Sequence, residues 1–209
     1  MRRTHKIRRM ALLHRVELNP TKLELLAVWL PGRPWYRGGP GAGLERLATF
    51  RFDDPEGEVG IETLLIGDGD GPLHHVPLTY RGAPLPDAEG WLVGTAEHGV
   101  LGRRWVYDAC GDPVYAAVLA GAIAGRIGQA EEYFEVDGRR EVRAPNMTIA
   151  LTTAIEAGQD GDHTVITTEA GRLAVIRRPD GHTRTAGPTL TGTWPAQPAP
   201  LPLAYALPS

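Results

Sequence analysis

A change in hydrophobic period at Leu47 constrains the fold more than any other feature of the sequence. Before it, apolar residues from Leu23 to Leu30 recur at helical spacing, and Asn19-Pro20 is predicted as the helix cap and first turn. After it, short runs alternate with period two, which is typical of β-strands. A helix followed by an antiparallel meander buries both apolar surfaces when the sheet curls around the helix. We therefore expect an α+β fold.

Five runs are predicted as strands of the meander: residues 47–52, 59–66, 75–80, 91–97 and 103–107. The stretch from Gly67 to Gly71 joins the second to the third, because Gly and Asp supply the backbone angles of a tight hairpin. Asp112-Pro113 repeats the cap-and-proline signal, and the Ala-rich stretch 114–127 is predicted as a second helix.

Residues 131–194 are predicted as a small β-rich unit. Its expected strands are residues 147–156, 163–168, 172–178 and 189–194, where Thr-rich and apolar alternation favours strand over helix. The polar stretch 131–143 fits a loop or a weak strand. The unit either stands apart or adds strands to the meander's sheet, and the pattern leaves both open. The Pro- and Ala-rich tail, residues 195–209, is expected to be extended and loose.

The composition is that of a globular chain of 209 residues, with 42% hydrophobic and 22% charged residues. A net charge of −3 gives no drive toward nucleic acid or an anionic membrane. No apolar run approaches the roughly 20 residues that span a bilayer. The single cysteine, Cys110, fits a reducing compartment. We expect a cytoplasmic, bacterial protein with no nucleic-acid or membrane partner.

Residues 1–13 are expected to form a disordered basic extension. Its basic residues are Arg2, Arg3, His5, Lys6, Arg8 and Arg9. A secretory signal needs an apolar core of about 7–15 residues after such a stretch, and residues 10–15 are too few to provide it.

Signals for phosphate or metal binding are weak. The glycine-dense stretch 38–43 has no strand before it and no Lys-Ser/Thr after it, so it fails the phosphate-loop pattern. Asp68 and Asp70 lack the further oxygen ligands of a calcium loop. Adjacent residues of a strand point to opposite faces, so His74 and His75 cannot share one metal ion from a regular strand. We expect neither a metal nor a cofactor.

Signals for nucleophilic catalysis are equally weak. The only serine is Ser209. Cys110 precedes a predicted helix, a position that can lower a thiol pKa, and His98 could act as its base. One cysteine and one histidine are, however, mostly a coincidence of composition. We therefore expect no catalytic residue.

The stretch from Glu97 to Asp108 concentrates polar and aromatic side chains around a short glycine turn. The candidate residues for binding a sugar, a phosphate or a partner are His98, Arg103, Arg104, Trp105 and Asp108, together with Tyr80 and Arg81. Trp105 would offer a stacking surface and the arginines would hold an anion. The favoured alternative is a structural hairpin, in which Arg and Asp pair with each other and Trp105 and Tyr107 lie in the core, because structural ion pairs are commoner than binding sites.

Several ordered motifs resemble the N-terminal cap region of maltokinases. They are NPTKLELL (19–26), WLP (29–31), ETLLIGDGD (62–70), HVPLTYR (75–81), VLGRRWVYD (100–108) and DPVY (112–115). The resemblance covers roughly residues 14–130, which we take as a maltokinase-cap-like domain. It implies a cystatin-like curved sheet wrapped on a helix, which in that family is set on the N-lobe of a kinase-like fold. The strand pattern predicts a compatible arrangement independently.

The remaining sequence departs from the kinase pattern. Residues 172–178 resemble the N-lobe strand that carries the ATP-positioning lysine, so 131–194 is similar to an N-lobe stub, but that strand has no lysine. No lysine follows Lys22, and no His-x-Asp loop is present. Phosphoryl transfer depends on the positioning and charge neutralisation that such groups provide. We therefore expect that the chain is not an enzyme.

Three functions remain as hypotheses. The first is a non-catalytic interaction or regulatory protein that, by the resemblance, is linked to maltose, trehalose or glycogen metabolism. Its partner would be another protein of sugar metabolism or a second copy of the chain. The alternatives are a protein that binds a small molecule, a sugar or a nucleotide, and an accessory subunit of a sugar kinase.

Overall fold

The computed structural model describes residues 11–12, 18–39, 43–67, 69, 71–136, 139–153, 155, 161–181 and 184–208. The predicted extension therefore lies almost wholly outside the described residues, and so do Asp68 and Asp70.

The first sheet has six antiparallel strands. Their spatial order is β2 (Leu18–Asn19), β6 (Leu92–His98), β7 (Gly102–Asp108), β5 (His74–Arg81), β4 (Gly60–Gly67) and β3 (Glu45–Phe52). Each of the five predicted strands of the meander is present. Between β6 and β7 the turn ends at Gly102, whose φ of 70° lies in the left-handed region that glycine tolerates best.

The second sheet has five antiparallel strands. Their spatial order is β10 (Thr148–Thr152), β13 (Thr189–Trp194), β14 (Gln197–Ala206), β12 (Gly171–Ile176) and β11 (His163–Thr168). A third, small sheet has the order β1 (Ala11–Leu12), β8 (Glu132–Val136) and β9 (Arg139–Val142), in which β1 is parallel to β8. The strands predicted beyond residue 130 thus form sheets of their own, rather than extending the first sheet.

The tail is not a loose end. It was expected to be extended, and it is, but residues 197–206 are β14, which lies between β13 and β12. Proline lacks a backbone donor and is tolerated in a strand where no partner needs one. In β14 the residues Pro198, Pro200 and Pro202 lie outside the part paired with β12, which is Ala204 to Ala206.

The first helix, α1 (Lys22–Trp29), begins later than predicted. Its N-cap is Thr21, whose Oγ1 accepts from the Glu24 amide at 3.3 Å, while the Glu24 carboxylate accepts from the Thr21 amide at 2.7 Å. This reciprocal capping box satisfies two backbone donors of the helix start. Asn19, the predicted cap, instead pairs with Glu97 as part of β2.

The second helix, α2 (Pro113–Ile123), begins as predicted. Asp112 is its N-cap and Oδ1 accepts from the Val114 amide at 2.9 Å, with Pro113 in the first turn. The helix ends at Ile123, a turn earlier than the sequence indicated.

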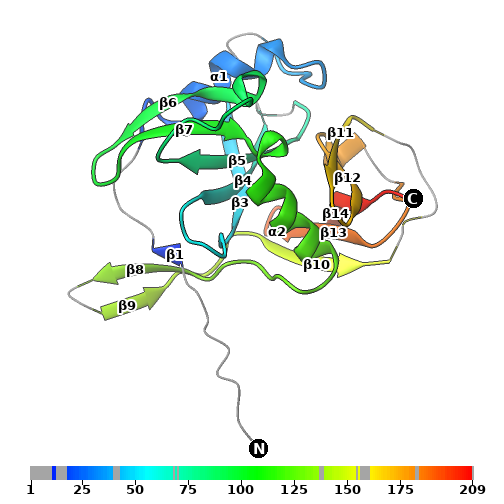
Figure 1. The fold of residues 1–209 in the computed structure, drawn as a ribbon. Coiled ribbons are helices and arrows are strands. Elements are labelled where there is room, and N and C mark those ends of the chain that lie inside the picture. The colour runs from blue at the N-terminus through cyan, green and yellow to red at the C-terminus, as the bar shows by residue number, and fades with distance from the viewer. Residues whose placement is uncertain are drawn as a thin grey trace, which may run out of the picture.

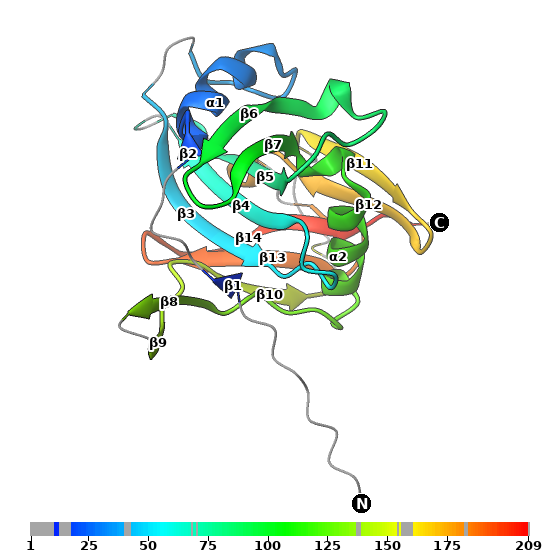
Figure 2. The ribbon, with the colours of Figure 1, turned by 60° about the vertical axis from the view of Figure 1, so that its left-hand side comes forward.

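The first sheet is covered on both faces, as Figures 1 and 2 show. From β4, Leu64 and Ile66 pack toward α1, whereas Ile61 and Leu65 belong to the core shared with α2 and the second sheet. Strands buried on both faces carry continuous apolar runs, which explains the sequence of β4. The molecule is therefore a mixed α+β fold: a curled antiparallel sheet, two helices and a second sheet.

Candidate functional site

The second sheet meets the first where β7 ends. β7 pairs with β5 only from Leu78 to Arg81, and it stops at Asp108. Beyond that point the His75 amide donates to the Arg177 carbonyl at 2.9 Å, and His75 Nδ1 lies 2.7 Å from the Ile176 carbonyl. The end of β12 thus continues along β5 in the place that β7 leaves open.

Arg177 holds this junction together and is completely buried. Its Nη2 donates to Asp108 Oδ2 at 2.6 Å and lies 3.1 Å from Cys110 Sγ. Nε donates to Thr164 Oγ1 at 2.7 Å, and Cζ stands 4.6 Å from the ring centre of Trp35. Burial opposes the charge on Arg177, but the Asp108 carboxylate outweighs burial, so the pKa of Arg177 is raised.

Cys110 and His75 are two further titratable groups of the junction, and burial disfavours the charged form of each. Burial raises the pKa of the Cys110 thiol well above its usual value, which agrees with the expectation that Cys110 is not a nucleophile activated by the nearby helix start. Burial lowers the pKa of His75 to about 4. Among the described residues, His75 Nε2 and Arg177 Nη1 have no hydrogen-bond partner. The arrangement favours a fixed ion pair over proton transfer.

The predicted residues His98, Arg103 and Arg104 lie at the β6–β7 hairpin. His98 Nδ1 accepts from the Val100 and Leu101 amides at 3.2 Å each, which caps the turn rather than activating Cys110. Arg103 Nε donates to Glu97 Oε1 at 2.9 Å, and Arg104 Nη2 donates to the Leu101 carbonyl. These side chains support the hairpin.

The structural-hairpin prediction holds for Tyr107 but not for Asp108 or Trp105. The sequence favoured pairing of Arg and Asp within the hairpin, but Asp108 pairs with Arg177, 69 residues away. Tyr107 lies in the core as predicted, and its hydroxyl accepts from the Leu85 amide at 2.9 Å. Trp105 is only half-buried.

Tyr80 and Arg81 belong to two further ion networks. The Tyr80 hydroxyl donates to Glu62 Oε2 at 3.0 Å, and Lys22 pairs with the same carboxylate. Burial raises the pKa of Glu62, but Lys22 and then Arg51 outweigh it and hold that pKa at about 2.

Arg81 forms a two-pronged ion pair with the cap of α2. Nε and Nη2 each lie 2.7 Å from an Asp112 oxygen. Planar guanidinium and carboxylate groups match in this geometry. The seven predicted residues are therefore divided among the hairpin, the junction and these two networks, and they do not converge on one site.

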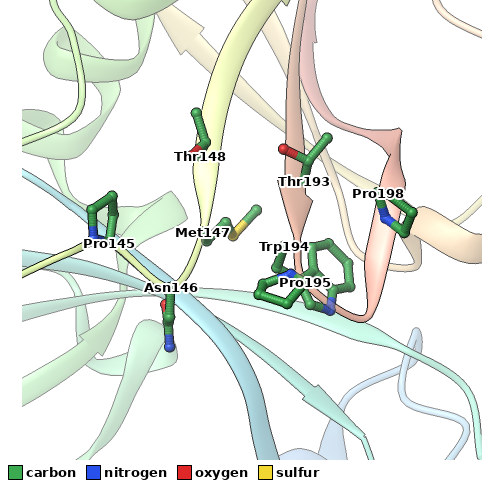
Figure 3. Close-up of a pocket in the computed structure, with 8 residues that line it drawn as sticks. All are labelled: Pro145, Asn146, Met147, Thr148, Thr193, Trp194, Pro195 and Pro198. Atoms are coloured by element: carbon green, nitrogen blue, oxygen red, sulfur yellow. The ribbon is translucent and has the colours of Figure 1, made fainter.

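A surface pocket of about 370 Å³ was not predicted from the sequence. Figure 3 shows its lining residues, which are Pro145, Asn146, Met147, Thr148, Thr193, Trp194, Pro195 and Pro198. They come from the start of β10 and the residues just before it, and from the end of β13, the turn after it and the start of β14. Asn146 Oδ1 is already engaged by the Thr49 amide at 3.0 Å. The proline-rich lining offers few polar groups for orienting a ligand.

No group of three or more His, Cys, Asp or Glu side chains that could hold a metal ion is found among the described residues. No helix in the described part of the chain is long and apolar enough to cross a membrane.

Comparison with known proteins identifies one domain family. Residues 29–112 match the family model described as the maltokinase N-terminal cap domain, a narrower span than the sequence motifs indicated. A search of curated proteins finds no match. The matched span runs from the last residue of α1 to Asp112, so it includes β3 to β7 and both acidic partners of the junction and the Arg81 pair. Over residues 29–112 the chain is therefore similar to the maltokinase N-terminal cap domain.

Proposed function

We propose that the chain is a non-catalytic interaction or regulatory module, which docks in the cytoplasm onto another protein of maltose, trehalose or glycogen metabolism. The family match of residues 29–112 supports the link to sugar metabolism. The cystatin-like classification of the curled sheet is part of this proposal, since it follows from the resemblance.

The observation that carries the proposal is that three buried carboxylates are each paired with a basic side chain of the same chain. Asp108 pairs with Arg177, Glu62 with Lys22, and Asp112 with Arg81. Each pair joins elements distant in sequence. A catalytic group needs a pKa near the working pH and access to a substrate, whereas these charges are fixed and face one another.

The β6–β7 hairpin offers the docking surface. Both faces of the first sheet are already covered by α1 and by the second sheet with α2. At the hairpin tip, however, Val100 is 61% exposed and Leu101 is 49% exposed. Their amides are held by His98, so the tip is fixed before binding and little conformational entropy is lost when a partner's apolar pocket receives it.

The hairpin can be tested by purifying tagged chain with its partners from the native host, identifying them by mass spectrometry, and measuring binding of the recombinant pair. We expect a protein of carbohydrate metabolism to bind, and the double variant Val100→Asp with Leu101→Asp to weaken its binding at least tenfold. Val28→Asp is the matched control, because Val28 is 85% exposed on α1. Unchanged binding of the double variant would remove the hairpin from the proposal.

The non-catalytic assignment is tested with the purified chain alone. We expect no phosphoryl transfer from Mg-ATP to maltose, and formation of maltose 1-phosphate would overturn the assignment. Calorimetry with ATP, maltose and maltose 1-phosphate addresses the alternative that the chain binds a small molecule. We expect no heat of binding with any of them, and tight binding of one would favour that alternative.

A further inference from the structure

The outer edge of β10 is not paired with another strand. β10 is the end strand of the second sheet and pairs with β13 alone (Figure 1). Its sequence, Thr-Ile-Ala-Leu-Thr, contains no charge, proline or glycine. Leu151 is 43% exposed, and Thr148, Ala150 and Thr152 are exposed as well. Proteins usually protect such edges with charges, prolines or covering segments, because an open edge pairs with another strand.

Another edge of the molecule is protected in this way. On β3, one of the two end strands of the first sheet, the Thr49 amide donates to Asn146 Oδ1 at 3.0 Å. Two residues further on, the Arg51 carbonyl accepts from the Ala130 amide at 2.9 Å. Ala130 and Asn146 therefore occupy part of the outer edge of β3, whereas the edge of β10 has a different protection.

Among the described residues, the side-chain hydrogen bonds to this edge come from Gln129. Its Nε2 donates to the Met147 carbonyl at 2.8 Å, and its Oε1 accepts from the Ile149 amide at 3.2 Å. The carboxamide thus takes the position of one peptide group of a neighbouring strand. Because the Ile149 amide points away from β13, the main-chain groups of Leu151, two residues further on, point to the same open side.

The order of residues in β10 is self-complementary. In an antiparallel pair centred on Ala150, Thr148 faces Thr152 of a second copy, and Ile149 faces Leu151 of that copy. Each facing pair therefore matches in chemical type and shape, which stabilises cross-strand pairing. A two-fold axis generates each of these contacts twice.

We propose that β10 pairs with β10 of a second copy about a two-fold axis at Ala150. The second sheets of the two copies then form one continuous sheet, and the pairing displaces Gln129 from the Ile149 amide. The hairpin tip on the first sheet takes no part, so this association is independent of the proposed docking function. Five paired residues make a small interface, and small interfaces are weak. The dimer is therefore expected to be weak, so the tests below extend to millimolar concentration.

A charge exchange at Ala150 tests the register. Ala150→Lys and Ala150→Glu each place like charges opposite one another across the axis, so each variant alone is expected to be monomeric by sedimentation equilibrium. An equimolar mixture is expected to dimerise again, because the opposed charges are then opposite in sign. Val165→Lys, at an exposed position of β11, is the control and should dimerise like the wild type. A mixture of folded variants that stays monomeric overturns the proposal.

Gln129 gives a second, opposite test. Gln129→Met keeps the length of the side chain but removes its hydrogen bonds, so the edge of the monomer loses its internal partner. We expect dimerisation to become about tenfold tighter. A wild type and a Gln129→Met variant that are both monomeric up to millimolar concentration overturn the proposal.

If the Ala150 variants do not fold, hydrogen exchange of the wild type still tests the pairing of β10. The Leu151 amide is expected to exchange more slowly as protein concentration rises, whereas exchange of the Thr49 amide should not change. Exchange at Leu151 that is independent of concentration contradicts the pairing. The variant Val100→Asp with Leu101→Asp should dimerise normally, so failure here is distinguishable from failure of the docking proposal.

Discussion

The junction and the β6–β7 hairpin each contain an arginine paired with a carboxylate, and the two pairs differ in almost every other respect. At the junction, Arg177 and Asp108 are 69 residues apart in sequence, with side chains 0% and 2% exposed. At the hairpin, Arg103 and Glu97 are six residues apart, with side chains 63% and 59% exposed. The same kind of ion pair is therefore required for stability at the junction and contributes little to stability at the hairpin.

The difference follows from solvation. A buried charge that loses its partner cannot recover the loss from water, whereas an exposed charge can. The buried pair joins Asp108, within residues 29–112 that match the cap-domain model, to Arg177, which directly follows β12 of the second sheet. We infer that residues 29–112 depend on the second sheet for stability.

The largest effect is expected from breaking the junction pair on one side. Arg177→Leu leaves Asp108 charged and buried without its partner, and should lower the free energy of unfolding by about 3–5 kcal/mol. Urea denaturation followed by circular dichroism measures it. The double variant Arg177→Leu with Asp108→Leu removes both charges and should recover part of the loss. A double variant less stable than the single one would contradict this account.

A smaller effect, dependent on pH, is expected at Glu62. Its pKa is about 2 in the folded chain against an ordinary value of 4.5, so the folded state favours the carboxylate. This contribution is fully present above pH 4.5 and is lost as the pH falls toward 2. A shift of this size corresponds to about 3 kcal/mol at most. In Glu62→Gln the loss of stability between these pH values should be absent. The same slope in both proteins would assign it to other groups.

His75 provides a control in a different pH range. Burial lowers its pKa to about 4 from 6.5, so the unfolded chain binds a proton more readily than the folded chain. Stability from this group is therefore lost as the pH falls from about 6.5 to 4. Glu62→Gln should retain that part of the pH dependence of stability, so the variant separates the contribution of Glu62 from that of His75.

The elements were predictable from the sequence where their signals are local. Period-two runs predicted β3 to β7, and Asp112-Pro113 predicted the start of α2. The start of α1 was misplaced because Asn19-Pro20 gives a cap signal as strong as that of Thr21, and only the pairing of Asn19 with β6 decides between them. The composition of the tail suggested a loose end, but tertiary pairing made it β14.

The candidate residues were less predictable, because their partners are distant in sequence. The hairpin motif correctly placed Tyr107 in the core, yet nothing local to Asp108 indicates that Arg177 reaches it. The sequence marked residues 172–178 as a strand that lacks the expected lysine. It did not show that Arg177 turns inward against Trp35, a contact that depends on β12 continuing along β5.

An effect of about 1 kcal/mol is expected at the start of α1. Thr21→Ala removes the side chain that accepts from the Glu24 amide, and loss of such a cap has this typical cost. Thermal unfolding measures it. Thr21→Ser keeps the hydroxyl and is the control. Equal destabilisation by both variants would assign the effect to packing of the lost methyl group.

The smallest effect is expected from the hairpin pair. Arg103→Gln removes the ion pair with Glu97, but both side chains are mostly in water, so the free energy of unfolding should change by less than about 0.5 kcal/mol. Urea denaturation at low and at high salt measures the change and its screening. If instead Arg103→Gln destabilised the chain as strongly as Arg177→Leu, solvation would not be what separates the two regions. A small effect at the hairpin and a large one at the junction would confirm that burial, rather than the pairing of opposite charges, decides what each arginine contributes.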